Sequence, residues 1–283
     1  MNQAISRIDT LPAVEAEIHY LARMAERPRN YTYEPPAGIP RSNIQPETHI
    51  VPIRDVRPIL SKVSLDREGF AVVNHRSSVH DFFDPEEVKT AYYPEAEALL
   101  KAATGADRVF IFDTTTRRRT EGASGAAGAP RQPVLRAHVD HTAKSGPERV
   151  RFWMGQDAEE LLRGRVQIIN VWRPARGPVL DSPLAFADAH SVASADLVPT
   201  DLVYPDRVGE TYSVYYNPEH RWFYLPRMQT DEVVLLKCYD SEEDGRARFA
   251  PHTAFIDPTT PEDAPPRESI ELRALVFHYA RGE

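Results

Sequence analysis

The stretch RESIELRALVF, residues 267–277, decides the fold that the sequence predicts. Side chains two positions apart in a β-strand lie on the same face of a sheet. With that period one face is apolar throughout: Ile270, Leu272, Ala274 and Val276. The other face begins with polar and charged groups: Arg267, Ser269, Glu271 and Arg273. The stretch therefore predicts a strand that packs on helices with one face and presents two arginines to a polar site with the other.

Short apolar runs of the same kind recur through the second half of the chain. Turn residues separate them, and they lie at 134–138, 166–172, 212–216, 222–225, 232–239 and 269–279. Residues 157–162 are a helical exception. Many short strands in succession are typical of an antiparallel sandwich or barrel. The predicted fold class is mainly β with flanking helices.

The first half of the chain is more mixed. Residues 11–26 carry apolar side chains at steps of three and four, which predicts a helix. Residues 84–103 predict a second helix, because Asp84 and Pro85 open it with an acidic first turn. Strands are predicted at 49–53, 69–74 and 108–113, an irregular segment at 29–48 and a mobile loop at 114–133.

The absence of a repeat or a clear linker favours a single domain over residues 1–283. We expect residues 1–68 to form a helical and irregular N-terminal flank and residues 69–283 to form the core with its flanking helices.

The net charge of -8 disfavours a nucleic-acid-binding protein, whose surface needs an excess of Lys and Arg. The one basic run, Arg117 to Arg119, has no interleaved aromatic residues and is interpreted as a solvated loop. The single cysteine, Cys238, excludes an intrachain disulfide and cysteine-based metal clusters. No apolar stretch approaches the roughly 18–20 residues that span a bilayer. We therefore expect a cytoplasmic protein without a membrane partner.

His138 and Asp140 follow a predicted strand and are two residues apart, so both can face one ion while Val139 points away. His252 lies in a later run, PHTAF at 251–255, and supplies a third ligand. Two histidines and one carboxylate form the facial triad of non-haem iron(II) oxygenases, which leaves three positions for cosubstrate and oxygen. Taken alone, His-x-Asp arises by chance, and a surface strand with alternating polar residues is the better explanation of the tripeptide in isolation.

The two arginines of the last strand strengthen the metal hypothesis. A dicarboxylate that binds iron through one end leaves its distal carboxylate in need of a guanidinium, which pairs with it bidentately. The arginines are six residues apart, roughly 20 Å along a strand, too far to serve one carboxylate. We assign the distal carboxylate to Arg267 with help from Ser269. Arg273 either brackets the other end of the site or forms a structural ion pair with Glu271.

Several further segments resemble a known family. They are YYPE at 92–95, NVWRP at 170–174, DSPLA at 181–185, YNPEHRW at 216–222, KCYDS at 237–241, PHTAF at 251–255 and SIELRA at 269–274. With the triad and Arg-x-Ser, they resemble the iron(II)- and 2-oxoglutarate-dependent oxygenases of the double-stranded β-helix, or cupin-like jelly-roll, fold. More narrowly, they resemble the hydroxylase/desaturase family of secondary metabolism, which includes the small component of cephalosporin methoxylase and fungal oxygenases of polyketides and meroterpenoids.

The resemblance implies that His138, Asp140 and His252 bind iron and that the strand of Arg267 and Arg273 holds 2-oxoglutarate. Oxygen is then the oxidant and ascorbate a possible external reductant. The substrate is a small organic molecule that is hydroxylated, desaturated, epoxidised or rearranged. The resemblance leaves the substrate, the outcome and the oligomeric state open, with a homodimer among the options.

Three residues are candidates for lining the substrate pocket. Asn170 and Trp172 share a strand face, and Tyr216 is an aromatic side chain of a later run. For Trp172 core packing, and for Asn170 a role in a turn, explain the residues at least as well. Two other functions also stay open: a cupin-type hydrolase or isomerase that uses zinc or manganese, and a non-catalytic binding protein of the same fold.

Overall fold

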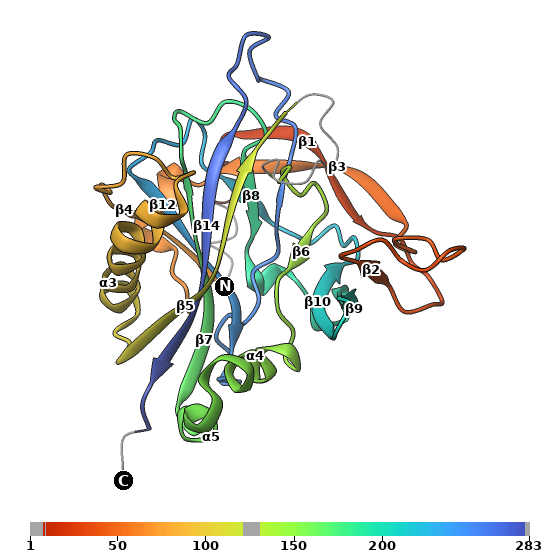
Figure 1. Cartoon of the computed structure of the whole chain (residues 1–283). Coiled ribbons are helices and arrows are strands. Elements are labelled where there is room, and N and C mark those ends of the chain that lie inside the picture. Colours follow the sequence, from red (N-terminus) through yellow and green to blue (C-terminus); the bar gives the residue numbers. More distant parts are fainter. Residues whose placement is uncertain (1–7, 9, 121–130, 281–283) are drawn as a thin grey trace.

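The computed structural model describes residues 8, 10–120 and 131–280 and shows two β-sheets with a few flanking helices (Figure 1). Within these residues the larger sheet has nine strands. In sheet order they are β1 (Ala13–Leu21), β3 (Pro46–Asp55), β11 (Trp222–Tyr224), β8 (Leu184–Ala187), β13 (His252–Ala254), β6 (His138–Val139), β10 (Val208–Val214), β9 (Leu197–Val203) and β2 (Arg29–Tyr31). The first strand also forms isolated bridges to Arg136 and Tyr215, so the sheet curls back on itself.

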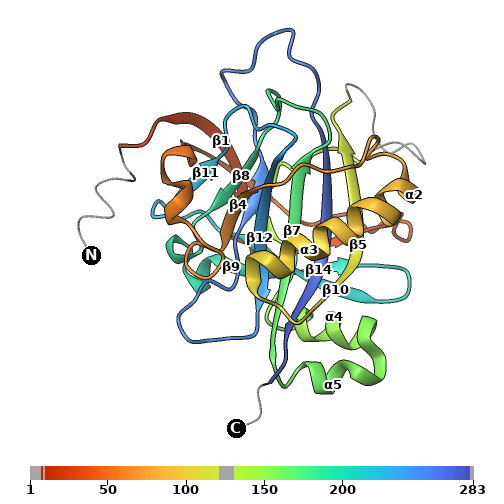
Figure 2. The same ribbon diagram turned by 90° about the vertical axis from the view of Figure 1, so that its left-hand side faces the viewer.

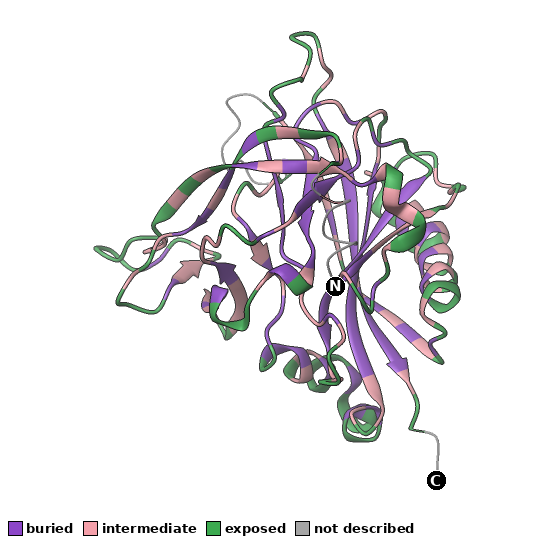
Figure 3. Cartoon of the chain, turned by 180° about the vertical axis from the view of Figure 1, so that it is seen from behind, coloured by how far each residue is buried: buried purple, intermediate pink, exposed green. Residues whose placement is uncertain are grey.

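The smaller sheet is the buried centre of the molecule. Its described strands, in order, are β4 (Phe70–Asn74), β12 (Glu232–Asp240), β7 (Arg165–Pro174), β14 (Glu268–His278) and β5 (Arg108–Arg118), all antiparallel. The three inner strands, β12, β7 and β14, are buried over most of their length, whereas the helices carry many exposed residues (Figure 3). The apolar face predicted for residues 270–276 packs, as expected, under α3 (Tyr93–Thr104), which crosses this sheet (Figure 2).

The predicted helix at 84–103 is confirmed as a composite element. The Asp84 side chain accepts hydrogen bonds from the backbone of Glu86 and Glu87, so it is the N-cap. The short α2 (Pro85–Glu87) continues through a π-helical turn, η2 (Val88–Tyr92), into α3. The expected helix at 157–162 appears as α5 (Ala158–Leu161), and α4 (Ser145–Met154) precedes it.

The predicted helix at 11–26 is wrong, because these residues form the strand β1. Its buried side chains alternate, and Ala16, Ile18 and Tyr20 face one cluster with residues of β3. The steps of three and four that suggested a helix arose because apolar residues occur on both faces. The strand expected at 49–53 is longer than predicted, and β2 interrupts the segment 29–48 that was expected to be irregular.

The loop predicted at 114–133 is partly wrong, since β5 continues to Arg118 in antiparallel pairing with β14. The central part of that prediction, residues 121–130, lies outside the described residues. The run Arg117–Arg119 is not a solvated loop either. Arg117 is half-buried in the space between the sheets, Arg118 pairs with Glu268, and Arg119 pairs with the buried Asp181.

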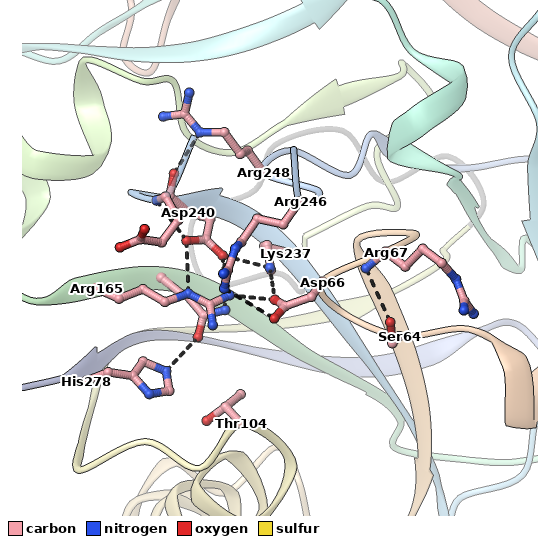
Figure 4. Close-up of polar contacts among 12 residues, drawn as sticks. Ser64, Asp66, Arg67, Thr104, Arg165, Lys237, Asp240, Arg246, Arg248 and His278 are labelled. Carbon is pink, nitrogen blue, oxygen red and sulfur yellow. Dashed lines mark hydrogen bonds and ion pairs between the residues drawn. The ribbon is translucent and has the colours of Figure 1, made fainter. Parts of the chain in front are cut away.

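A lysine within a strand normally indicates an exposed edge, and Lys237 departs from this rule. In the structure its side chain is fully buried and pairs with Asp66 and Asp240 at 2.6 and 2.7 Å. Arg165 and Arg246 complete this group of charges at one end of the small sheet (Figure 4). The physical reason is that β12 is an inner strand between β4 and β7 with every residue buried, so it is not an exposed edge strand.

Candidate metal centre and cosubstrate pocket

The three candidate ligands come together on the large sheet where it faces the small one. His138 of β6 is the direct antiparallel partner of His252 of β13, so the two rings lie on the same face. Their ring centroids are 4.5 Å apart. Asp140 follows β6 by one residue, and one ligand atom from each of the three side chains lies within 4.8 Å of the others. The spacing is that of a three-ligand metal centre.

Both histidines are oriented by the backbone. The Nδ1 of His138 lies 2.8 Å from the carbonyl oxygen of Arg136, and the Nδ1 of His252 lies 3.2 Å from that of Ala250. A carbonyl oxygen only accepts hydrogen bonds, so each Nδ1 carries the hydrogen and each Nε2 keeps its lone pair. Burial and the neighbouring His138 lower the pKa of His252, which favours the neutral imidazole that a metal requires. The two rings fit a metal through their Nε2 atoms.

Asp140 is held by donors from the opposite sheet. Its Oδ2 accepts from the Nδ2 of Asn170 on β7 and from the Nε of Arg273 on β14, both at 2.7 Å. Its Oδ1 lies 3.5 Å from the Nε2 of His138. Burial raises the pKa of this carboxyl, but Arg273 and the two histidines outweigh it, so the pKa lies well below its ordinary value. One oxygen is therefore occupied by the protein, and the other faces the histidines.

Arg273 is fully engaged with carboxylates. Besides Asp140 it pairs with Glu271 at 2.5 Å and with Asp113 at 2.7 Å. Burial lowers the pKa of Arg273, but these three acids together raise it well above its usual range. Of the two roles left open by the sequence, these contacts favour the ion pair that supports the site. Asn170 likewise supports the site, because its amide bridges Asp140 and Glu271.

Arg267 has a different environment. It is buried and lines a pocket together with the two metal-candidate histidines, Trp172 and Glu271. One terminal nitrogen donates to the carbonyl of Ser182 at 2.6 Å, but its Nε has no partner among the described residues. Burial and the nearby Arg117 lower the pKa of Arg267 to about 9. A buried guanidinium with an unused donor fits an anionic ligand in this pocket.

Of the remaining predicted site residues, Ser269 and Trp172 are beside Arg267. Ser269 is buried on the same face of β14, and the Trp172 ring lies under the Arg267 guanidinium at 5.5 Å. Tyr216 is elsewhere: it stacks on the ring of His49 at 3.5 Å and packs in the cluster of β1 and β3. The structure thus joins two of the three proposed substrate residues to the site and separates the third from it.

Sequence reasoning missed Arg117, which lines the same pocket as Arg267. The signal was present in the threonines at 114–116, since β-branched residues favour strands and indicate that the strand at 108 continues. The basic run at 117–119 indicated a loop instead, so the continuation of the strand was not predicted.

Known proteins share this architecture. Residues 18–277 match a family model described as an oxidoreductase/YMDC permease-like domain. No helix within the described residues is long and apolar enough to cross a membrane.

The chain is 36% identical to the Fe(II)/2-oxoglutarate-dependent dioxygenase nvfI of Aspergillus novofumigatus, over 87% of this chain and 90% of that protein. It is 34% identical to the hydroxylase/desaturase efuI of Hormonema carpetanum, over 94% and 95%.

A solved structure of a similar protein also matches this chain. The iron and alpha-ketoglutarate-dependent endoperoxidase NvfI superposes with a TM-score of 0.86 at 33% identity, covering 95% of this chain and 99% of that one. The predicted jelly-roll fold is thereby confirmed, as are the iron(II), 2-oxoglutarate and oxygen expected from the sequence. This chain belongs to the Fe(II)/2-oxoglutarate-dependent dioxygenases, within the hydroxylase/desaturase family of secondary metabolism, and is an enzyme that oxidises a small organic molecule.

Proposed function

We propose that His138, Asp140 and His252 hold the iron and that Arg267, with Ser269, holds the distal carboxylate of 2-oxoglutarate. The observation that carries this assignment is the juxtaposition of three potential ligands with a buried, incompletely bonded guanidinium in one pocket. A zinc or manganese hydrolase with the same ligands would have no use for that guanidinium. A binding protein of this fold would not need all three ligands.

The donor set suits iron(II). Imidazole nitrogens and one carboxylate oxygen are its preferred ligands, and a facial arrangement leaves positions for the cosubstrate and oxygen. When bound, iron and 2-oxoglutarate together supply the oxidising chemistry. The protein orients the ligands: backbone carbonyls fix both rings, and Asn170 with Arg273 occupies the second oxygen of Asp140. Asp140 is thus prepared to bind through one oxygen.

Trp172 is the proposed contact for the substrate or cosubstrate body, since its ring lines the pocket between Arg267 and the histidines. Whether the outcome is hydroxylation, desaturation, epoxidation or ring formation depends on how the substrate is held there. The single-domain organisation, the cytoplasmic location and the homodimer remain predictions.

The test is an anaerobic titration of the apo-protein with iron(II) and then 2-oxoglutarate, monitored by the weak visible charge-transfer band of the chelate. We expect the band in the wild type and its loss in His138→Ala. A matched control is His190→Ala, because the side chain of His190 is exposed and is not one of the three grouped ligands. Iron binding without any band in the wild type would contradict the assignment.

Turnover gives a second readout. Wild-type enzyme under oxygen should convert 2-oxoglutarate to succinate slowly even without the natural substrate, and His138→Ala should not. Candidate substrates are then ranked by how much they accelerate succinate formation.

A further inference from the structure

We propose that Arg117 and Arg267 form a two-guanidinium clamp on the distal carboxylate of the cosubstrate. This inference rests on the proposed binding of 2-oxoglutarate in the same pocket and adds a residue that the sequence pattern assigned to a loop. It makes Arg117 a binding residue for a dicarboxylate rather than a surface charge.

The register of the small sheet places Arg117 at the distal end of the pocket. Arg117 on β5 pairs directly with Ser269 on β14, while Asp113 pairs with Arg273. Arg267 is two residues before Ser269 on the same face, so it is the diagonal neighbour of Arg117. Four residues, roughly 13 Å along the strand, separate the level of Ser269 from that of Arg273, which binds Asp140. Arg117 therefore lies level with the predicted distal group and not with the metal.

Arg117 and Arg267 line the same pocket. Arg117 donates to the carbonyl oxygen of Gln132 at 2.8 Å, and neither guanidinium has a carboxylate within ion-pair distance among the residues described. The two acids beside them, Asp181 and Glu271, are paired with Arg119 and Arg273. Like charges brought together in a buried place repel each other, and an anion between them relieves this repulsion. A carboxylate offers two oxygens, one for each guanidinium.

The pairing of the buried acids favours the cosubstrate over an anionic substrate as the occupant. Asp140 and Glu271 are both paired with Arg273, so they are not available to Arg117 and Arg267. A ligand that reaches from the iron to the clamp must therefore bring its own carboxylate. 2-oxoglutarate does so, because it has a chelating end and a distal carboxylate in one molecule.

The test compares two ligands in anaerobic titrations of the iron-loaded enzyme. One is 2-oxoglutarate, and the other is 2-oxopentanoate, which has the same carbon chain and chelating end but no distal carboxylate. In Arg117→Met we expect the Kd of 2-oxoglutarate to rise about 10- to 100-fold, the range for a hydrogen bond to a charged group. The Kd of 2-oxopentanoate should change less than about twofold.

Arg118→Met is the matched control, since Arg118 follows Arg117 in the same strand but pairs with Glu268 and lies over the Phe83 ring. It should leave both affinities unchanged. An equal loss for both ligands in Arg117→Met would overturn the clamp, because it would place Arg117 at the chelating end or in a structural role. No loss for either ligand would overturn it as well.

Arg117→Lys is a second test of the clamp if Arg117→Met does not fold. Lysine retains the charge but not the planar fork, so only 2-oxoglutarate should lose affinity, by less than in Arg117→Met. If the wild type itself gives no chelate band, the proposed cosubstrate fails. If the wild type gives the band and the two ligands respond alike to changes at Arg117, only the clamp fails.

Discussion

Two groups of charged side chains in this molecule differ in whether each cation has an acidic partner. Around Lys237 every cation has an acid: Asp66 and Asp240 accept from Lys237, and both also accept from Arg165 (Figure 4). In the pocket, the guanidiniums of Arg267 and its neighbour Arg117 have only backbone carbonyls as hydrogen-bond partners among the described residues. The first group is complete without a ligand and serves the fold. The second is incomplete, which is what a site for an anion requires.

The pKa values report the same contrast. Burial raises the pKa of Asp66, but Lys237 and Arg165 outweigh it and lower that pKa to about 2. Burial and Arg117 instead lower the pKa of Arg267 to about 9, and the acids nearby offset only part of this. Around Lys237 the protein stabilises the charged forms of its side chains, whereas in the pocket the charge of Arg267 is poorly stabilised. The difference can be tested by removing one cation from each group.

The largest expected effect is on stability in Lys237→Met. Loss of this fully buried ammonium leaves Asp240, also fully buried, with Arg165 as its remaining cation. We expect the free energy of unfolding in urea to fall on the order of 3 kcal/mol, while iron and cosubstrate affinities of the folded protein are unchanged.

The matched control is Arg246→Met at the rim of the same group. Its side chain is partly exposed, and its acids Asp66 and Asp244 are half exposed, so it should cost less than about 1 kcal/mol. Similar losses in the two variants would show that burial does not distinguish them.

The next largest effect is expected in Arg267→Met, which should weaken cosubstrate binding and leave stability nearly unchanged. Here the unfolding free energy without ligand should stay within about 1 kcal/mol of the wild type, because no carboxylate is left unpaired. The Kd of 2-oxoglutarate should rise about 100-fold, the equivalent of a charged hydrogen-bonded contact. Urea unfolding and the anaerobic titration measure the two quantities, and a loss of stability as large as that of Lys237→Met would remove the contrast.

A smaller effect is expected at Asn170, which belongs to neither group but joins the pocket to the metal centre. Asn170→Ala removes one of the two donors to Asp140 Oδ2 and should weaken iron binding about tenfold. Competition with a chromogenic chelator measures it. Asn217→Ala is the control, because that amide also donates to a buried aspartate, Asp196, but lies outside the site. Equal iron affinity in the wild type and Asn170→Ala would show that Arg273 alone holds the carboxylate.

The smallest effect is in the pH dependence of stability. A carboxylate whose pKa is lower in the folded than in the unfolded protein stabilises the fold above its unfolded pKa, near 4, and loses this as the pH falls through the folded value. For Asp66 that window runs from about pH 4 down to about 2. The difference in unfolding free energy between wild type and Lys237→Met should therefore shrink from pH 5 to pH 3. For Arg267→Met the difference should stay constant over this range.

The strands of the small sheet were predictable because a period of two is local. Residues 267–277 show an apolar face and a polar face, and the structure packs the first under α3 and turns the second to the site. The helix at 11–26 was mispredicted because apolar residues on both faces of β1 produced a helical spacing by coincidence. The start of the loop predicted at 114–133 was wrong, because a basic run is normally solvated, whereas pairing with β14 extends β5 to Arg118 and places Arg117 in the pocket.

By itself the sequence determined the chemistry of this protein: the types of ligand, the Arg-x-Ser of the last strand and the alternation that makes a β-fold. These depend on residue identity and on neighbours two positions away. Only the tertiary structure decided which charges are compensated. Lys237 meets Asp66, and Arg273 meets Asp140, across more than 130 residues of chain. The guanidiniums of Arg117 and Arg267 line one pocket, and neither is in an ion pair with an acid among the described residues. Partners distant in sequence are set by sheet register and packing, so the same type of side chain stabilises the fold in one place and awaits a ligand in the other.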